Sequence, residues 1–258
     1  MQLSIITINY NNASGLEQTF KSIENQSYKH YEYIVIDGGS TDGSLNIIKE
    51  YEHLLNYWIS EKDTGIYNAI NKGIHIAKGK YLFFLNSGDL LHDNQVLDTI
   101  IPDLNNEDIV YGNLLIKELN RSWLKIYPSK LLFSYFLNDS LPHSGGIFIL
   151  KSAFKNELRI YDESLKIVSD WKWFMLALFK YNYSYKYLDK TIGIFDFTGI
   201  SARPENSKLL LSEKKQVLEK YFPRFYPEIA NLTSYKNELY MLKSSRYFKL
   251  YMKLKTLF

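Results

Sequence analysis

Four short segments rich in Asn, Asp, Ser and Gly each follow an apolar run, and these residue types can bind metals and phosphorylated ligands. The segments are residues 9–12, 37–43, 61–65 and 86–89. Residues of these types also occur in turns for loop geometry alone. Because four such segments follow four successive apolar runs, the pattern favours a binding site over that simpler explanation.

The chain has no cysteine, so any metal site must use oxygen or imidazole ligands. Such ligands favour Mg²⁺ or Mn²⁺ over structural zinc. The glycine-rich loops of dinucleotide-binding and P-loop proteins are missing, since the first strand–helix turn carries only Gly15. Without such a loop, a bound diphosphate needs a cation to offset its charge, and Asp89 is the obvious anchor for it.

The elements that must position these segments alternate along the first half of the chain. Apolar runs predict strands at residues 3–9, 33–37, 56–60 and 80–85. Amphipathic patterns predict helices between them, at residues 15–25, 43–53 and 67–77. This alternation predicts an α/β fold with a mostly parallel sheet and helices on both faces. Ligands bind beyond the carboxyl ends of the strands in such sheets, which is where the polar segments lie.

The second half has a looser pattern. Strands are predicted at residues 108–111, 114–118 and 147–150, and helices at 130–137, 170–181, 207–221 and 227–258. A chain of 258 residues, 46% of them apolar, can form one large domain with an appendage. We predict a main domain at residues 1–203, with halves 1–105 and 106–203, and a helical extension at 204–258.

Four motifs follow one another through the first half: SIITINYN from Ser4, IVIDGGSTDG from Ile34, GIYNAINKG from Gly65 and FLNSGD from Phe84. A weaker series continues at residues 142–146, 169–171 and 199–201. Their order and spacing resemble those of family 2 glycosyltransferases of the GT-A fold, including bacterial polysaccharide enzymes. The resemblance implies an enzyme that uses a nucleotide-sugar and a divalent cation. Residues 1–105 would bind the nucleotide-sugar, and residues 106–203 would lie on the acceptor side.

The resemblance implies roles for residues of the first half. Asp37 would accept a hydrogen bond from N3–H of uracil, so the expected donor is a UDP-sugar. Asp89 fills the last position of a D-x-D-like motif and would hold Mg²⁺ or Mn²⁺ against the diphosphate. Gly88 stands where the family often has a second acid, which leaves one carboxylate. The other residues implied in nucleotide-sugar binding are Thr7, Asn9, Tyr10, Asp63, Asn71, Lys72 and Ser87.

On the acceptor side, Asp170 stands where the family places its catalytic base. An inverting transfer needs one carboxylate to take the proton of the acceptor hydroxyl. An aspartate at the start of a helix is also common for its favourable interaction with the helix dipole. His143 and Trp171 are implied in acceptor binding, although purely structural roles for both stay open.

The C-terminal extension is the basic part of the chain. Residues 204–258 hold 11 of the 31 basic and 5 of the 28 acidic residues, a formal charge of +6, whereas residues 1–203 carry −3. Basic and aromatic side chains alternate in residues 236–258, which fits a helix on an anionic membrane surface, with ordinary packing as the other possibility. Nucleic acid is not an expected partner because the main domain is acidic and lacks a recognition motif.

The first residues form a predicted strand and not a leader, and no apolar run approaches the roughly 20 residues that cross a bilayer. We expect a cytoplasmic protein with peripheral contact to the inner face of the membrane. The predicted function is an inverting glycosyltransferase that extends a cell-surface polysaccharide, such as an O-antigen or capsule unit, on a polyprenyl-diphosphate carrier. A catalytically weak relative that binds nucleotide-sugars or a partner enzyme is the alternative, and Gly88 favours it. A nucleotidyltransferase is disfavoured because residues 9–12 replace its glycine-rich first loop.

Overall fold

The computed structural model describes residues 1–118, 121–196, 204–229, 231 and 245. The strands are β1 (Leu3–Asn9), β2 (Tyr31–Asp37), β3 (Tyr57–Ser60), β4 (Tyr81–Phe84), β5 (Leu90–Leu91), β6 (Ile109–Glu118), β7 (Arg121–Lys125), β8 (Ile147–Leu150) and β9 (Tyr185–Asp196). The α-helices are α1 (Ala13–Glu24), α2 (Ser44–Glu50), α3 (Ile66–Ile76), α4 (Val96–Ile100), α5 (Phe133–Phe136), α6 (Ser169–Phe179) and α7 (Ser207–Tyr221). Short 3₁₀ helices are η1 (Glu52–Leu54), η2 (Ile101–Asp103), η3 (Lys151–Ala153), η4 (Asn156–Leu158) and η6 (Pro204–Asn206).

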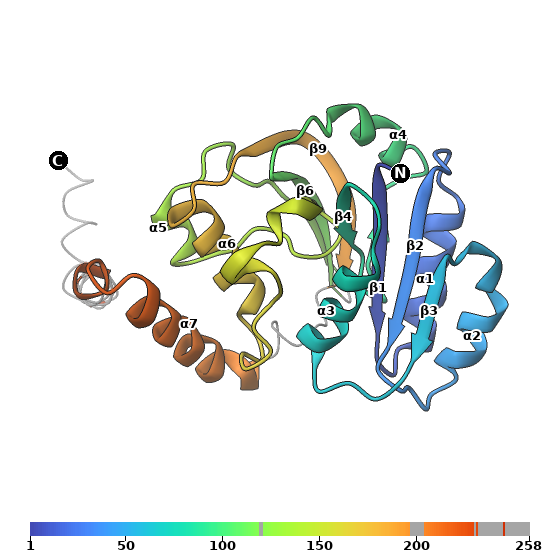
Figure 1. Cartoon of the computed structure of the whole chain (residues 1–258), viewed down its shortest axis with the longest axis horizontal. Helices are drawn as coiled ribbons and strands as arrows, with labels where there is room; N and C mark the ends of the chain where they lie inside the picture. Colours follow the sequence, from blue (N-terminus) through green and yellow to red (C-terminus); the bar gives the residue numbers. More distant parts are fainter. Residues whose placement is uncertain (119–120, 197–203, 230, 232–244, 246–258) are drawn as a thin grey trace. The chain divides into compact units, whose positions relative to one another are not determined.

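The chain divides into two compact units, Met1–Leu210 and Leu211–Phe258. In the first unit the described strands form one sheet, in the order β3-β2-β1-β4-β8-β6-β9-β5, with β7 paired to β6 (Figure 1). Strands β3, β2, β1 and β4 are mutually parallel. The other half of the sheet is mixed, because β8 runs antiparallel to β4 and β6 while β9 runs parallel to β6.

The two faces of the parallel half are covered by different helices, as the alternation of side chains along a strand requires. Leu3 and Ile5 of β1 belong to a core cluster with Phe20 of α1. Ile6 points to the opposite face, where it meets α3: a Cβ on Gly73 would lie 2.5 Å from its Cγ2. Glycine at this position therefore allows α3 to pack closely on β1.

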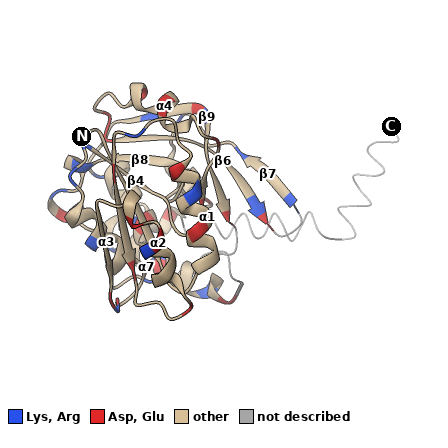
Figure 2. Ribbon diagram, turned by 90° about the vertical axis from the view of Figure 1, so that its right-hand side faces the viewer, with Lys and Arg blue, Asp and Glu red and all other residues tan. Residues whose placement is uncertain are grey.

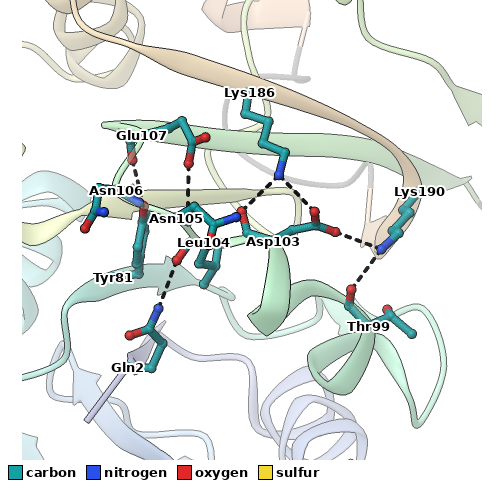
Figure 3. A network of polar contacts seen from close by, with 10 residues as sticks. All are labelled: Gln2, Tyr81, Thr99, Asp103, Leu104, Asn105, Asn106, Glu107, Lys186 and Lys190. Atoms are coloured by element: carbon teal, nitrogen blue, oxygen red, sulfur yellow. Dashed lines mark hydrogen bonds and ion pairs between the residues drawn. The ribbon is translucent and has the colours of Figure 1, made fainter.

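A polar network fixes β9 beside the segment that follows α4 (Figure 3). Asp103 accepts hydrogen bonds from the ammonium groups of Lys186, at 2.9 Å, and Lys190, at 3.0 Å, both on β9. These two bonds hold the pKa of Asp103 below its ordinary value. Gln2 donates to the carbonyl of Leu104 at 3.1 Å, which ties the same segment to the start of β1.

The β6–β7 ribbon contains a strand, β7, that is exposed at four of its five positions. Figure 2 shows it extending from the other strands, with basic residues at both ends of β7. The side chains of Trp123 and Leu124 are exposed although both are apolar. Because β7 has neither buried positions nor an alternation of polar and apolar residues, the sequence did not predict it.

Several other elements differ from the predictions. Two predicted strands in 108–118 form the single strand β6, and the helix predicted at 130–137 is reduced to the four residues of α5. Strands β5 and β9 and helix α4 were not predicted. The helix predicted at 207–221 has the bounds of α7, whereas most of the helix predicted at 227–258 lies outside the described residues. Within the part that the structure describes, no helix combines the length and the apolar character needed to cross a membrane.

Candidate active site

Asp37 joins the carboxyl ends of the first three strands. Its Oδ1 accepts hydrogen bonds from Asn9 Nδ2 at 2.7 Å and Ser40 Oγ at 2.6 Å. Its Oδ2 accepts from Ser60 Oγ at 2.6 Å and from the backbone N–H groups of Ser40, at 2.9 Å, and Gly39, at 3.2 Å. Burial acts to raise the pKa of Asp37, but the hydrogen bonds, led by that of Ser40, outweigh it and leave the pKa below its ordinary value.

These bonds occupy the roughly four acceptor positions of a carboxylate. Asp37 is fully buried, so the N3–H of a uracil would have to replace one of the two serine hydroxyls. The carboxylate holds β1, β2 and β3 together at their ends, and its role in reading a base stays a prediction.

Two side chains lie against Gly38, the residue that follows Asp37. A Cβ on Gly38 would lie 2.5 Å from Asp63 Oδ2 and 3.2 Å from Cδ2 of Tyr10, so both side chains lie against the bare glycine backbone. The Tyr10 side chain is 66% exposed. An exposed phenol ring beside a carboxylate can stack on a nucleobase while the carboxylate accepts a hydrogen bond from it.

Thr7 and Asn71, both predicted in the nucleotide-sugar site, have internal partners. The hydroxyl of Thr7 is fully buried and donates to the carbonyl of Leu85 at 2.7 Å. Asn71 exchanges two hydrogen bonds with the backbone of Tyr161 and donates to Glu163, which fastens α3 to the segment before α6. In this structure both side chains therefore hydrogen-bond to other protein groups and hold neighbouring segments together.

Lys72 pairs with Glu61 at 2.7 Å. Both line a cavity of about 380 Å³ between α3 and the edge strand β3. Lys72 therefore has an acidic partner at this cavity, and its contact with a diphosphate stays a prediction.

The loop 86–89 is held by side chains from three distant segments. The hydroxyl of Thr19 accepts from the N–H of Gly88 at 2.9 Å and donates to the carbonyl of Asp89 at 2.9 Å. Asn12 Nδ2 donates to the carbonyl of Ser87 at 3.0 Å. Ser144 Oγ donates to the Asp89 carboxylate and accepts from the N–H of Asn86 at 2.9 Å. Gly88 has a φ of +100°, a conformation that favours glycine.

Asp89 is a buried carboxylate without a cationic partner among the described residues. Its Oδ2 accepts from Ser144, and its Oδ1 accepts from the N–H of Asp196 at 3.0 Å. Burial raises the pKa of Asp89 to about 7; these two hydrogen bonds oppose the shift, and the negative charge of Asp196 adds to it. The Asp196 carboxylate lies close by, since its Oδ2 is 3.7 Å from a Cβ built on Gly88.

This donor set fits a divalent cation that takes most of its ligands from substrate. The described residues contain no group of three or more His, Asp or Glu side chains that could hold a metal alone. Two carboxylates, Asp89 and Asp196, lie together, and the buried Oδ1 of Asn86 has no hydrogen-bond partner in the described part of the chain. Mg²⁺ is commonly held by one or two carboxylates together with substrate phosphates and water.

Asp170 lies in the first turn of α6, and its Oδ1 accepts a hydrogen bond from Tyr67 Oη at 2.9 Å. The imidazole of His143 is close to Asp170. Burial lowers the pKa of His143, and the negative charge of Asp170 opposes that shift. His143 also stacks on Phe84 with a centroid separation of 4.8 Å, and its buried Nε2 has no hydrogen-bond partner among the described residues.

Trp171 is packed in the interior of the protein. Its indole N–H donates to the carbonyl of Phe136 at 2.8 Å, and the side chain is buried in the core. This packing is the structural role that the sequence left open. Stacking of Trp171 on an acceptor sugar stays a prediction without a contact to support it.

Three residues of the site were not singled out from the sequence: Tyr67, Ser144 and Asp196. Tyr67 and Ser144 lie inside the motifs GIYNAINKG and PHSGG, and this position could have marked them as candidate site residues. Asp196 ends a strand that was not predicted, so no sequence signal placed it beside Asp89.

The fold is shared with solved structures at low sequence identity. S. aureus TarS 1–349 in complex with UDP-GlcNAc superposes with a TM-score of 0.63 and 20% identity, covering 88% of this chain and 73% of TarS 1–349. The mannosyltransferase PcManGT from Pyrobaculum calidifontis, in complex with GDP-Man and Mn²⁺, gives a TM-score of 0.56 at 12% identity, covering 99% of this chain and 84% of that chain. The chain therefore has the GT-A fold, as predicted.

The family model described as "Glycosyl transferase family 2" matches residues 4–158, which include the four motifs and His143. The chain belongs to this family. An uncharacterised glycosyltransferase of Mycobacterium tuberculosis is 46% identical over 88 residues, 34% of each chain. The poly(ribitol-phosphate) β-N-acetylglucosaminyltransferase TarP of Staphylococcus aureus is 36% identical over 129 residues, 47% of this chain and 39% of TarP. The chain thus spans only about a third of the length of these relatives.

Proposed function

We propose that the chain is an inverting glycosyltransferase that moves a sugar from a UDP-sugar to a hydroxyl group of a lipid-linked saccharide during cell-surface polysaccharide synthesis. One observation carries this proposal: of two adjacent residues, one hydrogen-bonds to Asp89 and the other is affected by the charge of Asp170. Ser144 donates to Asp89, and the neighbouring His143 lies within the electrostatic reach of Asp170. The proposed cation ligand and the proposed base therefore belong to one site.

In the proposed reaction, Asp170 takes the proton of the acceptor hydroxyl as its oxygen forms a bond to the anomeric carbon. The bond between that carbon and the diphosphate oxygen breaks, and the nucleoside diphosphate leaves with the electron pair. A single displacement of this kind needs one base and no enzyme nucleophile, and it inverts the configuration at the anomeric carbon. General-base catalysis contributes about 10²–10⁴-fold to such steps.

Asp89 and Asp196 are the residues that would hold Mg²⁺ or Mn²⁺. The bound cation would offset the charge of the leaving diphosphate. Binding of the cation would also lower the pKa of Asp89, because a nearby positive charge favours the ionised form of a carboxylate, which burial disfavours. Tyr10 and Asp63 would hold the base over Gly38, and Asn9, Ser87 and Gly88 line the adjacent strand ends.

UDP-GlcNAc is the first donor to test. The TarS structure contains this nucleotide-sugar, and the name of TarP describes an N-acetylglucosaminyltransferase. PcManGT binds GDP-Man, so guanosine donors belong in the same screen. The screen measures release of nucleoside diphosphate from UDP-, GDP- and dTDP-sugars with Mn²⁺ and with EDTA. Mn²⁺-dependent turnover of UDP-sugars supports the proposal, and turnover of only GDP- or dTDP-sugars would overturn the choice of donor.

A catalytically weak relative that binds nucleotide-sugars or a partner enzyme is the second candidate. The observation in its favour is that both oxygens of Asp89 accept internal hydrogen bonds while Gly88 replaces an acid. Binding of UDP-GlcNAc without hydrolysis or transfer, across the whole donor screen, would support this candidate against the enzyme.

A further inference from the structure

Tyr67 is the one described side chain that donates a hydrogen bond to Asp170. Its Oη lies 2.9 Å from Asp170 Oδ1 and 2.6 Å from the carbonyl oxygen of Ile167. Tyr67 is 5% exposed and lies in the first turn of α3, whereas Asp170 lies in the first turn of α6. The contact thus ties the donor-side half of the site to the acceptor-side half.

The phenol can only act as a donor to this carboxylate. Burial, and then the negative charge of Asp170, raise the pKa of Tyr67 well above its ordinary value. Hydrogen bonds from the backbone N–H groups of Asp170 and Ser169 act in the opposite direction but are outweighed. Tyr67 therefore keeps its proton across the working range of an enzyme. A donor held against a carboxylate favours the charged form and fixes its orientation.

The other titratable groups that respond to the Asp170 charge are uncharged. They are Tyr161, whose pKa is raised by burial, and His143, whose pKa is lowered by burial. No ion pair to Asp170 is formed within the described residues. On α6 itself, Lys172 is paired with Asp162 at 2.6 Å. The hydroxyl of Tyr67 is consequently the group best placed to orient Asp170.

We propose that Tyr67 is a positioning residue for the base, an inference that rests on the proposed function. Its hydroxyl holds Oδ1 of Asp170 and directs Oδ2, which accepts no hydrogen bond from the described residues, toward the acceptor. Oδ2 then takes the acceptor proton as the new glycosidic bond forms and the nucleoside diphosphate departs with the electrons of the broken bond. Tyr67 transfers no proton itself.

The test compares Tyr67→Phe with the full-length wild type in Mn²⁺-dependent hydrolysis of UDP-GlcNAc, in which water takes the place of the acceptor. Misplacement of the base should lower kcat about 10- to 100-fold, with KM for UDP-GlcNAc unchanged. A carboxylate that loses a donor holds its proton more tightly. The acid limb of the kcat/KM profile should therefore move to higher pH in Tyr67→Phe.

Tyr111→Phe is the matched control. Tyr111 is buried, and its hydroxyl donates to a backbone carbonyl, that of Pro128, at 2.6 Å and not to an acid. Both variants lose a buried tyrosine hydrogen bond, so both should lose similar thermal stability. Only Tyr67→Phe should change the pH profile.

Asp170→Asn separates failure of this inference from failure of the proposed function. An inactive Asp170→Asn enzyme together with a wild-type pH profile for Tyr67→Phe would overturn the positioning role alone. A fully active Asp170→Asn enzyme would overturn both the base and the residue proposed to position it. A shifted acid limb in Tyr67→Phe, with Tyr111→Phe unchanged, supports the inference.

Discussion

At the scale of single residues, the site contains two buried carboxylates whose pKa values are shifted in opposite directions. Asp37 has several donors and a pKa below its ordinary value, whereas Asp89 has two and a pKa raised to about 7. The number of donors facing each group explains the difference, since hydrogen bonds to a carboxylate favour its charged form. Asp37 is therefore satisfied within the protein, and Asp89 is the group that a cation would stabilise.

Replacing Asp89 tests that contrast. Asp89→Asn should reduce Mn²⁺-stimulated hydrolysis of UDP-GlcNAc by about 10²-fold or more, because a metal ion contributes several kcal/mol of charge stabilisation. Mn²⁺ should raise the melting temperature of the wild type and not that of the variant. Asp93→Asn, an exposed acid near the same loop, is the control and should behave like the wild type. Retention of Mn²⁺-stimulated turnover in Asp89→Asn would remove the metal role.

At the scale of elements, the ends of three parallel strands depend on one side chain. Asp37 on β2 accepts hydrogen bonds from Asn9 on β1 and from Ser60 on β3. The loop after β2 contributes Ser40 and Gly39. Loss of this carboxylate should loosen all three strand ends together, and with them the region between Tyr10 and Asp63.

We expect Asp37→Asn to lower the free energy of unfolding at pH 7 by about 2–3 kcal/mol, because the amide leaves buried donors unsatisfied. The folded pKa of Asp37 is lowered, so its contribution is present above its unfolded pKa and is lost as pH falls through the folded value. Melting curves should show the gap to wild type narrowing below about pH 4. The exposed neighbour Asp42 serves as control, and a gap for Asp37→Asn no larger than for Asp42→Asn would contradict this account.

Strands β1, β2 and β4 could be predicted because they are buried on both faces, whereas the edge strand β3 was predicted from its short apolar run although no position in it is buried. β1 is buried at all seven positions, and the predicted strand has the same bounds. β9 could not be predicted: its exposed positions follow no regular period, and its register with β6 shifts near Asn113. Motifs identified Asp37, Asp89 and Asp170, but neither Asp196 nor the contacts between these side chains and their partners. Asp89 accepts hydrogen bonds from Ser144 and Asp196, which are 55 and 107 positions away in the sequence. The local spacing of residues carries no information about contacts between positions so far apart.

At the scale of the whole molecule, the predicted main domain and the predicted extension differ in charge. Residues 1–203 carry a formal −3 and residues 204–258 carry +6. Apart from residue 245, the basic and aromatic segment 236–258 lies outside the described residues, so its membrane contact stays a proposal based on the sequence. An acceptor on a lipid carrier would place the reaction at a membrane surface, where a basic segment is attracted to anionic lipid.

Deletion of residues 236–258 tests that proposal. The full chain should sediment with phosphatidylserine vesicles and the shortened chain should stay in solution, because each basic residue near an anionic surface contributes about 1 kcal/mol. Phosphatidylcholine vesicles and high salt are the controls, since both remove the electrostatic attraction. Equal sedimentation of the two chains would assign the segment to packing alone. Hydrolysis of UDP-GlcNAc should be the same in both chains.

The central claim is an inverting transfer with one base, and the configuration of the product tests it most directly. Donors of this kind carry an α-linked sugar, so a single displacement by the wild-type enzyme gives a β-linked product. Proton NMR of the purified product reads the configuration from the coupling constant of the anomeric proton in the new linkage. A β linkage is the result this account predicts, and an α linkage would contradict it.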